Sequence, residues 1–122
     1  MKKIVKKSSI TIDSIYSMAN ISPKLTGLNC VIWVDSMGKY RNVAHNVPRV
    51  KLEEDGYGIS ISIEPNPKIL VKSANIPHSV MKDFKKGIKY IGLNYDLFLK
   101  HYLDEDFSYS DSDLILDLKK RS

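Results

Sequence analysis

The fold of this chain is decided by the stretch Val80–Tyr102, which reads VMKDFKKGIKYIGLNYDLFLKHY. Its apolar residues recur at alternating spacings of four and three, which aligns them on one face of an α-helix. They are Phe84, Ile88, Ile91, Tyr95, Phe98 and Tyr102. We predict one long helix packed across a sheet, because the stripe keeps its phase; a break near Asn94 is the alternative. Gly87 and Gly92 weaken a helix and indicate close contact with the sheet or a bend.

Upstream of this helix, alternating and β-branched segments predict four or five antiparallel strands. The clearest is Leu28–Asp35, which is apolar on both faces and is therefore expected at the centre of the sheet. The other expected strands are Tyr40–Ala44, Arg49–Glu53, Ile59–Glu64 and Lys68–Lys72, the last with Ile69 and Val71 turned inward. Asp55-Gly56 is the strongest hairpin signal in the chain.

Helices are also expected towards both ends of the chain. Thr11–Ile21 is predicted as a short helix, closed by the proline that follows. Asn75 or Ser79 is expected to cap the long helix, and Ser112 to cap a last short helix, Asp113–Lys120. The resulting fold class is α+β: an antiparallel meander of four to five strands, one long helix packed across one face, and a short C-terminal helix.

The length of 122 residues predicts one domain, and the net charge of +5 is unevenly distributed along it. Residues 1–103 carry 16 Lys and Arg against 8 Asp and Glu, whereas residues 104–122 carry 3 against 6. We predict a basic disordered tail at 1–9, a single domain at 10–103, and an acidic linker with the last helix at 104–122. The acidic end can fold back over a basic surface or screen it from nucleic acid.

The single cysteine, Cys30, excludes an intrachain disulfide and is expected to be a small buried apolar residue. A reducing cytoplasm is the expected location. No stretch approaches the roughly 20 apolar residues of a membrane span. The tail residues Lys2–Lys7 are expected to be solvated; contact with phosphate or anionic lipid is the alternative.

Polar residues that do not fit the strand alternation predict a candidate site in two neighbouring groups. They are Asp35, Lys39, Arg41, His45, Asn46 and Arg49, followed by Glu64 and Asn66. Alternate turns of a meander fall at the same end of the sheet, so the two groups are expected to adjoin. In an enzyme, His45 would act as general acid or base while Arg41 and Arg49 hold a phosphate. The alternative is a turn at His45 and two arginines on a solvated sheet face.

The second candidate surface is the polar side of the long helix. It carries Lys82, Lys85, Lys86 and Lys89, which form either a solvated face or a docking face for an acidic partner or phosphates. The three histidines lack the spacing of metal ligands, so we predict no metal site. No glycine-rich phosphate loop or nucleophile motif is present, and we predict no cofactor.

Two segments resemble a small bacterial family of uncharacterised domains over about residues 20–105. His45–Lys51, HNVPRVK, is similar to the family's His-x-Pro-Pro-His-Phe-His-type strand, and Leu93–Tyr102, LNYDLFLKHY, to its C-terminal helix. The family's later histidines are replaced here by Arg49 and Lys51, so a histidine cluster is not carried over. Genes of that family often lie beside toxin–antitoxin or mobile-element genes. The resemblance implies a small, non-catalytic or regulatory partner protein.

Three functions follow as hypotheses. The first, which we favour, is a binding protein of a toxin–antitoxin, phage or defence-related locus that docks on a protein partner. The second is nucleic-acid binding through Lys2–Lys7 and the helix lysines, with an affinity that falls steeply with salt. The third is a metal-independent ribonuclease that uses His45, Arg41 and Arg49.

Overall fold

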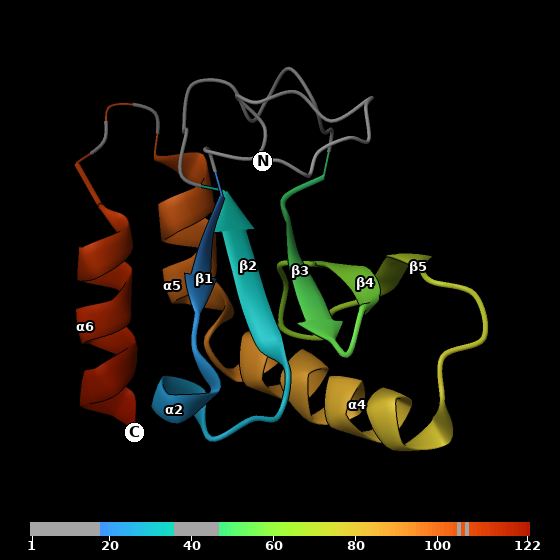
Figure 1. Cartoon of the computed structure of the whole chain (residues 1–122). Helices are drawn as coiled ribbons and strands as arrows, with labels where there is room; N and C mark the ends of the chain where they lie inside the picture. Colours follow the sequence, from blue (N-terminus) through green and yellow to red (C-terminus); the bar gives the residue numbers. More distant parts are fainter. Residues whose placement is uncertain (1–17, 36–46, 105, 107) are drawn as a thin grey trace, which may run out of the picture.

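The computed structural model describes residues 18–35, 47–104, 106 and 108–122, and it shows an α+β fold (Figure 1). A five-stranded antiparallel sheet in sequential strand order is followed by helices, which confirms the predicted meander. The strands are β1 (Met18–Ile21), β2 (Val31–Asp35), β3 (Arg49–Glu54), β4 (Tyr57–Ser62) and β5 (Ile69–Lys72). The helices are α2 (Pro23–Thr26), α4 (His78–Leu93), α5 (Tyr95–Leu103) and α6 (Asp111–Arg121). No helix in these ranges has the length and apolar character needed to cross a membrane.

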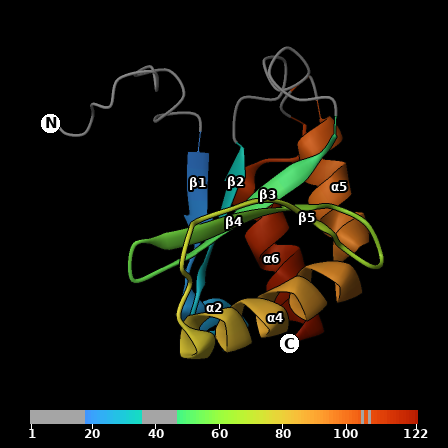
Figure 2. The same ribbon diagram turned by 90° about the vertical axis from the view of Figure 1, so that its right-hand side faces the viewer.

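The alternation along the strands gives the sheet two different faces. One face carries a buried row across four strands: Ile21, Ile32, Leu52 and Ile59. The adjacent row on the opposite face consists of Asn20, Trp33, Lys51, Ser60 and Val71. Figures 1 and 2 show α4 and α5 on the same side of the sheet, where they cover the buried row. The core therefore lies between the sheet and these helices.

The β3–β4 hairpin forms at the predicted position. Asp55 and Gly56 both have positive φ angles, 53° and 84°, as a two-residue type I′ turn requires. Glycine adopts this conformation without a steric cost, and aspartate tolerates it better than most residues. Glu54 pairs with Tyr57 across the turn, so the register of the whole hairpin is set here.

The long helix is broken at Asn94, so the prediction of one continuous helix was wrong. Asn94 has φ −117° and ψ 22°, and its side-chain Nδ2 donates to the Tyr90 carbonyl oxygen at 3.0 Å. Asparagine competes in this way with the helical hydrogen bonds, and the preceding glycine lowers helix propensity further. The apolar stripe continues beyond the break, because Phe98 and Tyr102 are buried, whereas Leu93 at the break is 71% exposed. Tyr95, expected in the stripe, is also exposed.

The two glycines of α4 mark close contacts, as predicted. A Cβ atom built at Gly87 would lie 2.8 Å from Leu52 Cδ1 and 3.0 Å from Cys30 Sγ. One built at Gly92 would lie 2.5 Å from the carbonyl oxygen of Pro65. Gly87 therefore lets the helix approach the sheet, and Gly92 lets it approach the β4–β5 connection.

The C-terminal helix is part of the domain core. Leu114 and Leu118 are fully buried, although the segment was predicted as an acidic linker with an appended helix. Ser110 accepts from the Asp113 N–H and the Asp113 side chain accepts from the Ser110 N–H. This capping box starts the helix two residues before the predicted Asp113, and Ser112 is not its cap.

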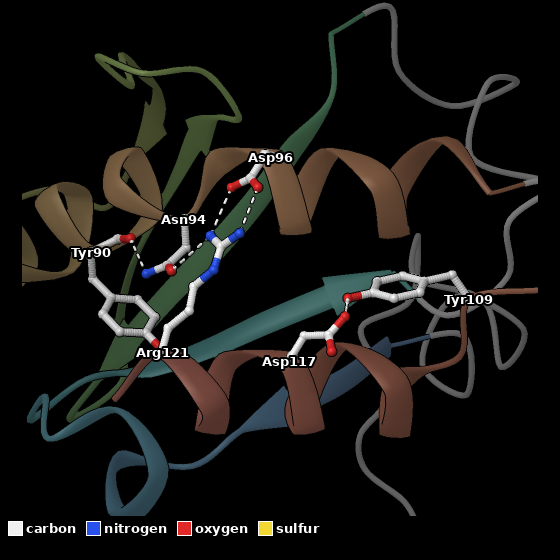
Figure 3. A network of polar contacts seen from close by, with 6 residues as sticks. All are labelled: Tyr90, Asn94, Asp96, Tyr109, Asp117 and Arg121. Atoms are coloured by element: carbon white, nitrogen blue, oxygen red, sulfur yellow. Dashed lines mark hydrogen bonds and ion pairs between the residues drawn. The ribbon is translucent and has the colours of Figure 1, made fainter.

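Polar contacts join the last helix to α5 and to the connection that precedes the helix (Figure 3). The Tyr109 hydroxyl donates to Asp117 Oδ2 at 2.6 Å, and Arg121 reaches Asn94 and Asp96. A further hydrogen bond of 2.7 Å joins the buried ring of His101 to Asp111 (not drawn in Figure 3). The acidic segment therefore folds back onto α5 and the α4–α5 junction.

Several other boundaries differ from the predictions. Within the predicted helix Thr11–Ile21, Met18–Ile21 forms β1, because it pairs with residues of β2 and ladder pairing overrides weak local propensity. The central strand is β3, not the segment Leu28–Asp35. Ile69 and Val71 are exposed, because β5 is an edge strand beyond the cover of the helices.

The start of α4 also differs from the prediction. Pro77 occupies the N-cap position, and no side chain caps the helix. Asn75 instead takes a φ of 56° in the preceding turn, and Ser79 lies inside the helix. The predicted tail 1–9 and strand Tyr40–Ala44 lie outside the described residues.

Candidate functional site

The loop site predicted from the sequence is only partly within the described residues. Lys39, Arg41, His45 and Asn46 lie outside them. Asp35 is half-buried at the end of β2, and Asn66 is exposed in the β4–β5 connection. The structure therefore does not describe the position of His45, the general acid or base of the ribonuclease hypothesis.

The two polar groups of the sequence were expected to adjoin. The backbone near Arg49, in the first group, does lie beside the backbone near Glu64, in the second. Arg49 pairs with Ser62, and the Ile63 N–H donates to the Pro48 carbonyl at 3.0 Å. Ser62 is buried, and its hydroxyl donates to the Glu64 carboxylate. The Arg49 guanidinium contacts the Val47 carbonyl at 3.4 Å. These hydrogen bonds join the start of β3 to the end of β4, and the prediction of Glu64 as a binding residue stays a prediction.

The lysines predicted as a second surface do form one face of α4. Lys82, Lys85, Lys86 and Lys89 are all exposed. The opposite side of the helix buries Val80, Phe84, Gly87 and Ile91 in the core. In the part of the chain that the structure describes, none of the four lysines takes part in an ion pair. We call these four residues the lysine face.

Asp83 is the one acidic residue of α4, and its side chain contacts residues outside the lysine face. Its Oδ1 accepts from Asn29 Nδ2 at 3.1 Å, and its carboxyl group lies close enough to that of Glu54 to raise the pKa of Glu54. Burial, followed by the contact with Asp83, raises the pKa of Glu54 to about 7. The acidic side chain thus connects α4 to β3 and does not neutralise the lysines.

Cys30 is next to this carboxyl pair and is buried, as predicted. Burial and then the charge of Glu54 raise the pKa of its thiol to about 11. The thiol is therefore protonated at neutral pH, and it fits the core role against Gly87 better than that of a nucleophile.

A hollow of about 410 Å³ lies beside the lysine face, where β5 connects to α4. It is lined by Lys72, Ser73, Ala74, Asn75, Ile76, His78, Met81, Lys82 and Lys85. The hollow brings two predicted residues, Lys82 and Lys85, together with Lys72 from the sheet edge. His78 opens the helix beside them.

The electrostatics of this hollow favour negatively charged groups. Three lysines border it, and the uncapped start of α4 adds the partial positive charge of a helix N-terminus. Lys72 and His78 were not predicted as site residues. No sequence pattern predicted them, because their position depends on where the connection between β5 and α4 lies against the sheet.

The described residues contain no group of three or more His, Cys, Asp or Glu side chains that could hold a metal ion. No protein-family model, curated protein or solved structure matches the chain.

Proposed function

We propose that the chain is a small non-catalytic binding protein that docks on an acidic surface of a protein partner through the lysine face of α4. The observation that carries this proposal is the grouping of four exposed lysines with a lysine-bordered hollow. Following the family resemblance, the partner is a product of the same toxin–antitoxin, phage or defence-related locus. The expected compartment is the cytoplasm.

The absence of ion pairs at the lysine face in the described residues supports a docking role. Surface lysines that are already paired gain little from a new acidic partner, whereas these four keep their full charge for one. A complementary acidic patch would speed association and fix orientation more than it would add affinity. The docking rate is therefore expected to fall with added salt.

The composition of the hollow favours a protein partner over a nucleic acid. Ile76 and Met81 contribute apolar surface next to the lysines, and interface cores typically combine apolar contacts with a charged rim. Proteins that bind single-stranded nucleic acids stack the bases on aromatic side chains. Among the described residues, no Phe, Tyr or Trp side chain lines this hollow, and His78 is its one aromatic ring.

The proposal is tested by co-purification from the organism that encodes the chain, using a tagged full-length protein. The test variant is Lys82→Gln/Lys85→Gln/Lys89→Gln. The matched control is Lys24→Gln/Lys119→Gln/Lys120→Gln, which removes the same charge from exposed positions on α2 and α6.

The expected result is a co-purifying protein that the wild type and the control retain and the lysine-face variant loses. Recovery of the chain alone would overturn the proposal, as would equal retention by both variants. Retained material that is removed by nuclease treatment would favour nucleic-acid binding instead.

A further inference from the structure

Strand β5 forms one edge of the sheet and presents apolar side chains to solvent. Ile69, Leu70 and Val71 are 41%, 37% and 60% exposed. Among residues 18–35 and 47–104, β5 pairs with β4 and with no other strand. In Figure 2, which looks onto this edge, no described helix or strand passes in front of β5. The backbone groups of its outer edge are thus open to a further strand.

An exposed apolar edge strand is a liability unless it has a partner, because it can pair with other chains. β5 has only partial protection: it is short, and its register with β4 shifts between Ser60 and Ile61. Lys68 precedes the apolar residues and Lys72 ends the strand. The charges at the two ends determine which strands can pair with it.

Pairing with a second copy is disfavoured by these charges. In a two-fold symmetric antiparallel pair centred on Leu70, Lys68 of each copy would face Lys72 of the other. Like charges directly opposite each other destabilise a sheet. An incoming strand with acidic ends has the opposite effect, since both lysines then face carboxylates.

We propose that β5 accepts an extended segment of the protein partner, apolar in its middle and acidic at its ends, as an added antiparallel strand. This inference rests on the proposed function and specifies what the acidic partner presents. Main-chain hydrogen bonds would supply affinity, and the side chains of alternate residues would supply specificity.

The surroundings of β5 suit such a segment at both faces of the sheet. Beyond Lys72, the strand leads directly into the hollow bordered by Lys82 and Lys85, where an acidic end of the segment can bind. On the other side, a second hollow of about 360 Å³ includes Lys51, Ser60 and Val71 in its lining. Apolar side chains of the added strand would lie beside Val71 in this second hollow.

The test is a titration of the isotope-labelled full chain followed by amide NMR shifts, with three synthetic peptides. The probe is Asp-Glu-Val-Thr-Val-Thr-Val-Glu-Asp. One control replaces the central Val and the Thr that follows it by Pro, which keeps the charge and removes backbone donors from both edges of the segment. The other control replaces every acidic residue by Lys.

The expected result is that the probe shifts the amides of Ile69–Lys72 together with those of Lys82 and Lys85, and that neither control shifts the β5 amides. If both acidic peptides shift only the amides of α4, the inference fails and the proposed function survives. If no peptide shifts either region, the inference fails, and the proposed function is decided separately by the co-purification test. Equal shifts of β5 by the lysine peptide would overturn the acidic specificity.

A pair of variants tests the same inference with a matched control. Val71→Asp places a carboxylate on β5, and Leu116→Asp does so at a comparably exposed apolar position on α6. We expect Val71→Asp to weaken probe binding roughly tenfold, the size of effect typical of a residue that matters in an interface. Leu116→Asp is expected to leave it unchanged. Unchanged binding by a folded Val71→Asp protein would overturn the inference.

Discussion

Arg121, in the last turn of α6, forms a two-point ion pair with Asp96, in the first turn of α5. Its Nη1 and Nη2 atoms donate to the two carboxylate oxygens at 2.9 and 2.7 Å (Figure 3). Hydrogen bonding from Arg121 lowers the pKa of the Asp96 carboxyl group. The pair joins two segments that lie 25 residues apart and so fixes the end of the chain.

Replacing Arg121 by Ala should lower the free energy of unfolding only slightly, because both partners are substantially exposed and exposed ion pairs contribute little. Urea denaturation measures the difference. Lys119→Ala, two residues away and exposed, is the control and should have no effect. A loss as large as that expected for truncating a buried leucine would contradict the weak contribution expected of an exposed ion pair.

Leu118→Ala should destabilise the protein by about 2–5 kcal/mol, as is typical when a buried leucine is truncated. The reason is that α6 completes the core and is not an appended tail. Leu116→Ala, on the exposed side of the same helix, should change the stability by less than about 0.5 kcal/mol. Similar small effects of both substitutions in urea denaturation would contradict the docking of α6.

Gly92→Ala should destabilise the fold by roughly 1–3 kcal/mol, the usual cost of overpacking. The added Cβ atom would collide with the Pro65 backbone carbonyl, which cannot turn aside as a side chain can. At Gly58, the nearest atom is Lys51 Cε, near the end of a flexible side chain, so Gly58→Ala should be tolerated. Thermal unfolding of the two variants compares them, and equal midpoints would contradict the close contact.

The Glu54–Asp83 carboxyl pair predicts a pH dependence of stability. The pKa of Glu54 is about 7 in the folded protein against an ordinary 4.5, so the folded state binds more protons between these values. The free energy of unfolding should therefore fall as the pH rises from about 4.5 to about 7, and then level off.

Glu54→Gln should remove this fall and stabilise the protein at pH 8, because the amide stays uncharged where the carboxylate would carry a charge. Urea denaturation across the pH range measures the effect. Glu53→Gln, the neighbouring residue on the other face of β3, is the control and should keep the dependence of the wild type. If the stability of Glu54→Gln depended on pH as that of the wild type does, the Glu54–Asp83 pair would not be the cause of this dependence.

Local patterns in the sequence predicted those parts of the fold that depend on local interactions. The alternation of Ile59 and Ile61 and the Asp55-Gly56 turn were sufficient for the β3–β4 hairpin. The helical periodicity correctly predicted that Phe84, Ile91 and Phe98 are buried. Periodicity carries no information on the direction of a helix axis, however, and the break at Asn94 depends on a side-chain bond to Tyr90.

The candidate site could be predicted only in part, for a similar reason. Exposure of Lys82 and Lys85 followed from their position opposite the apolar stripe. Their meeting with Lys72 depends on where the β5–α4 connection returns to the sheet, and this is a tertiary contact. The exposure of Val71 likewise depends on β5 lying at an edge, which strand order decides and alternation does not.

The central claim, docking through the lysine face, is tested most directly by titrating the co-purified partner against the wild type and both triple lysine variants at several salt concentrations. Our account predicts that Lys82→Gln/Lys85→Gln/Lys89→Gln weakens binding by about tenfold or more at low salt and flattens its salt dependence. The control Lys24→Gln/Lys119→Gln/Lys120→Gln should bind like the wild type. Equal affinities and equal salt dependence for the two variants would contradict the account.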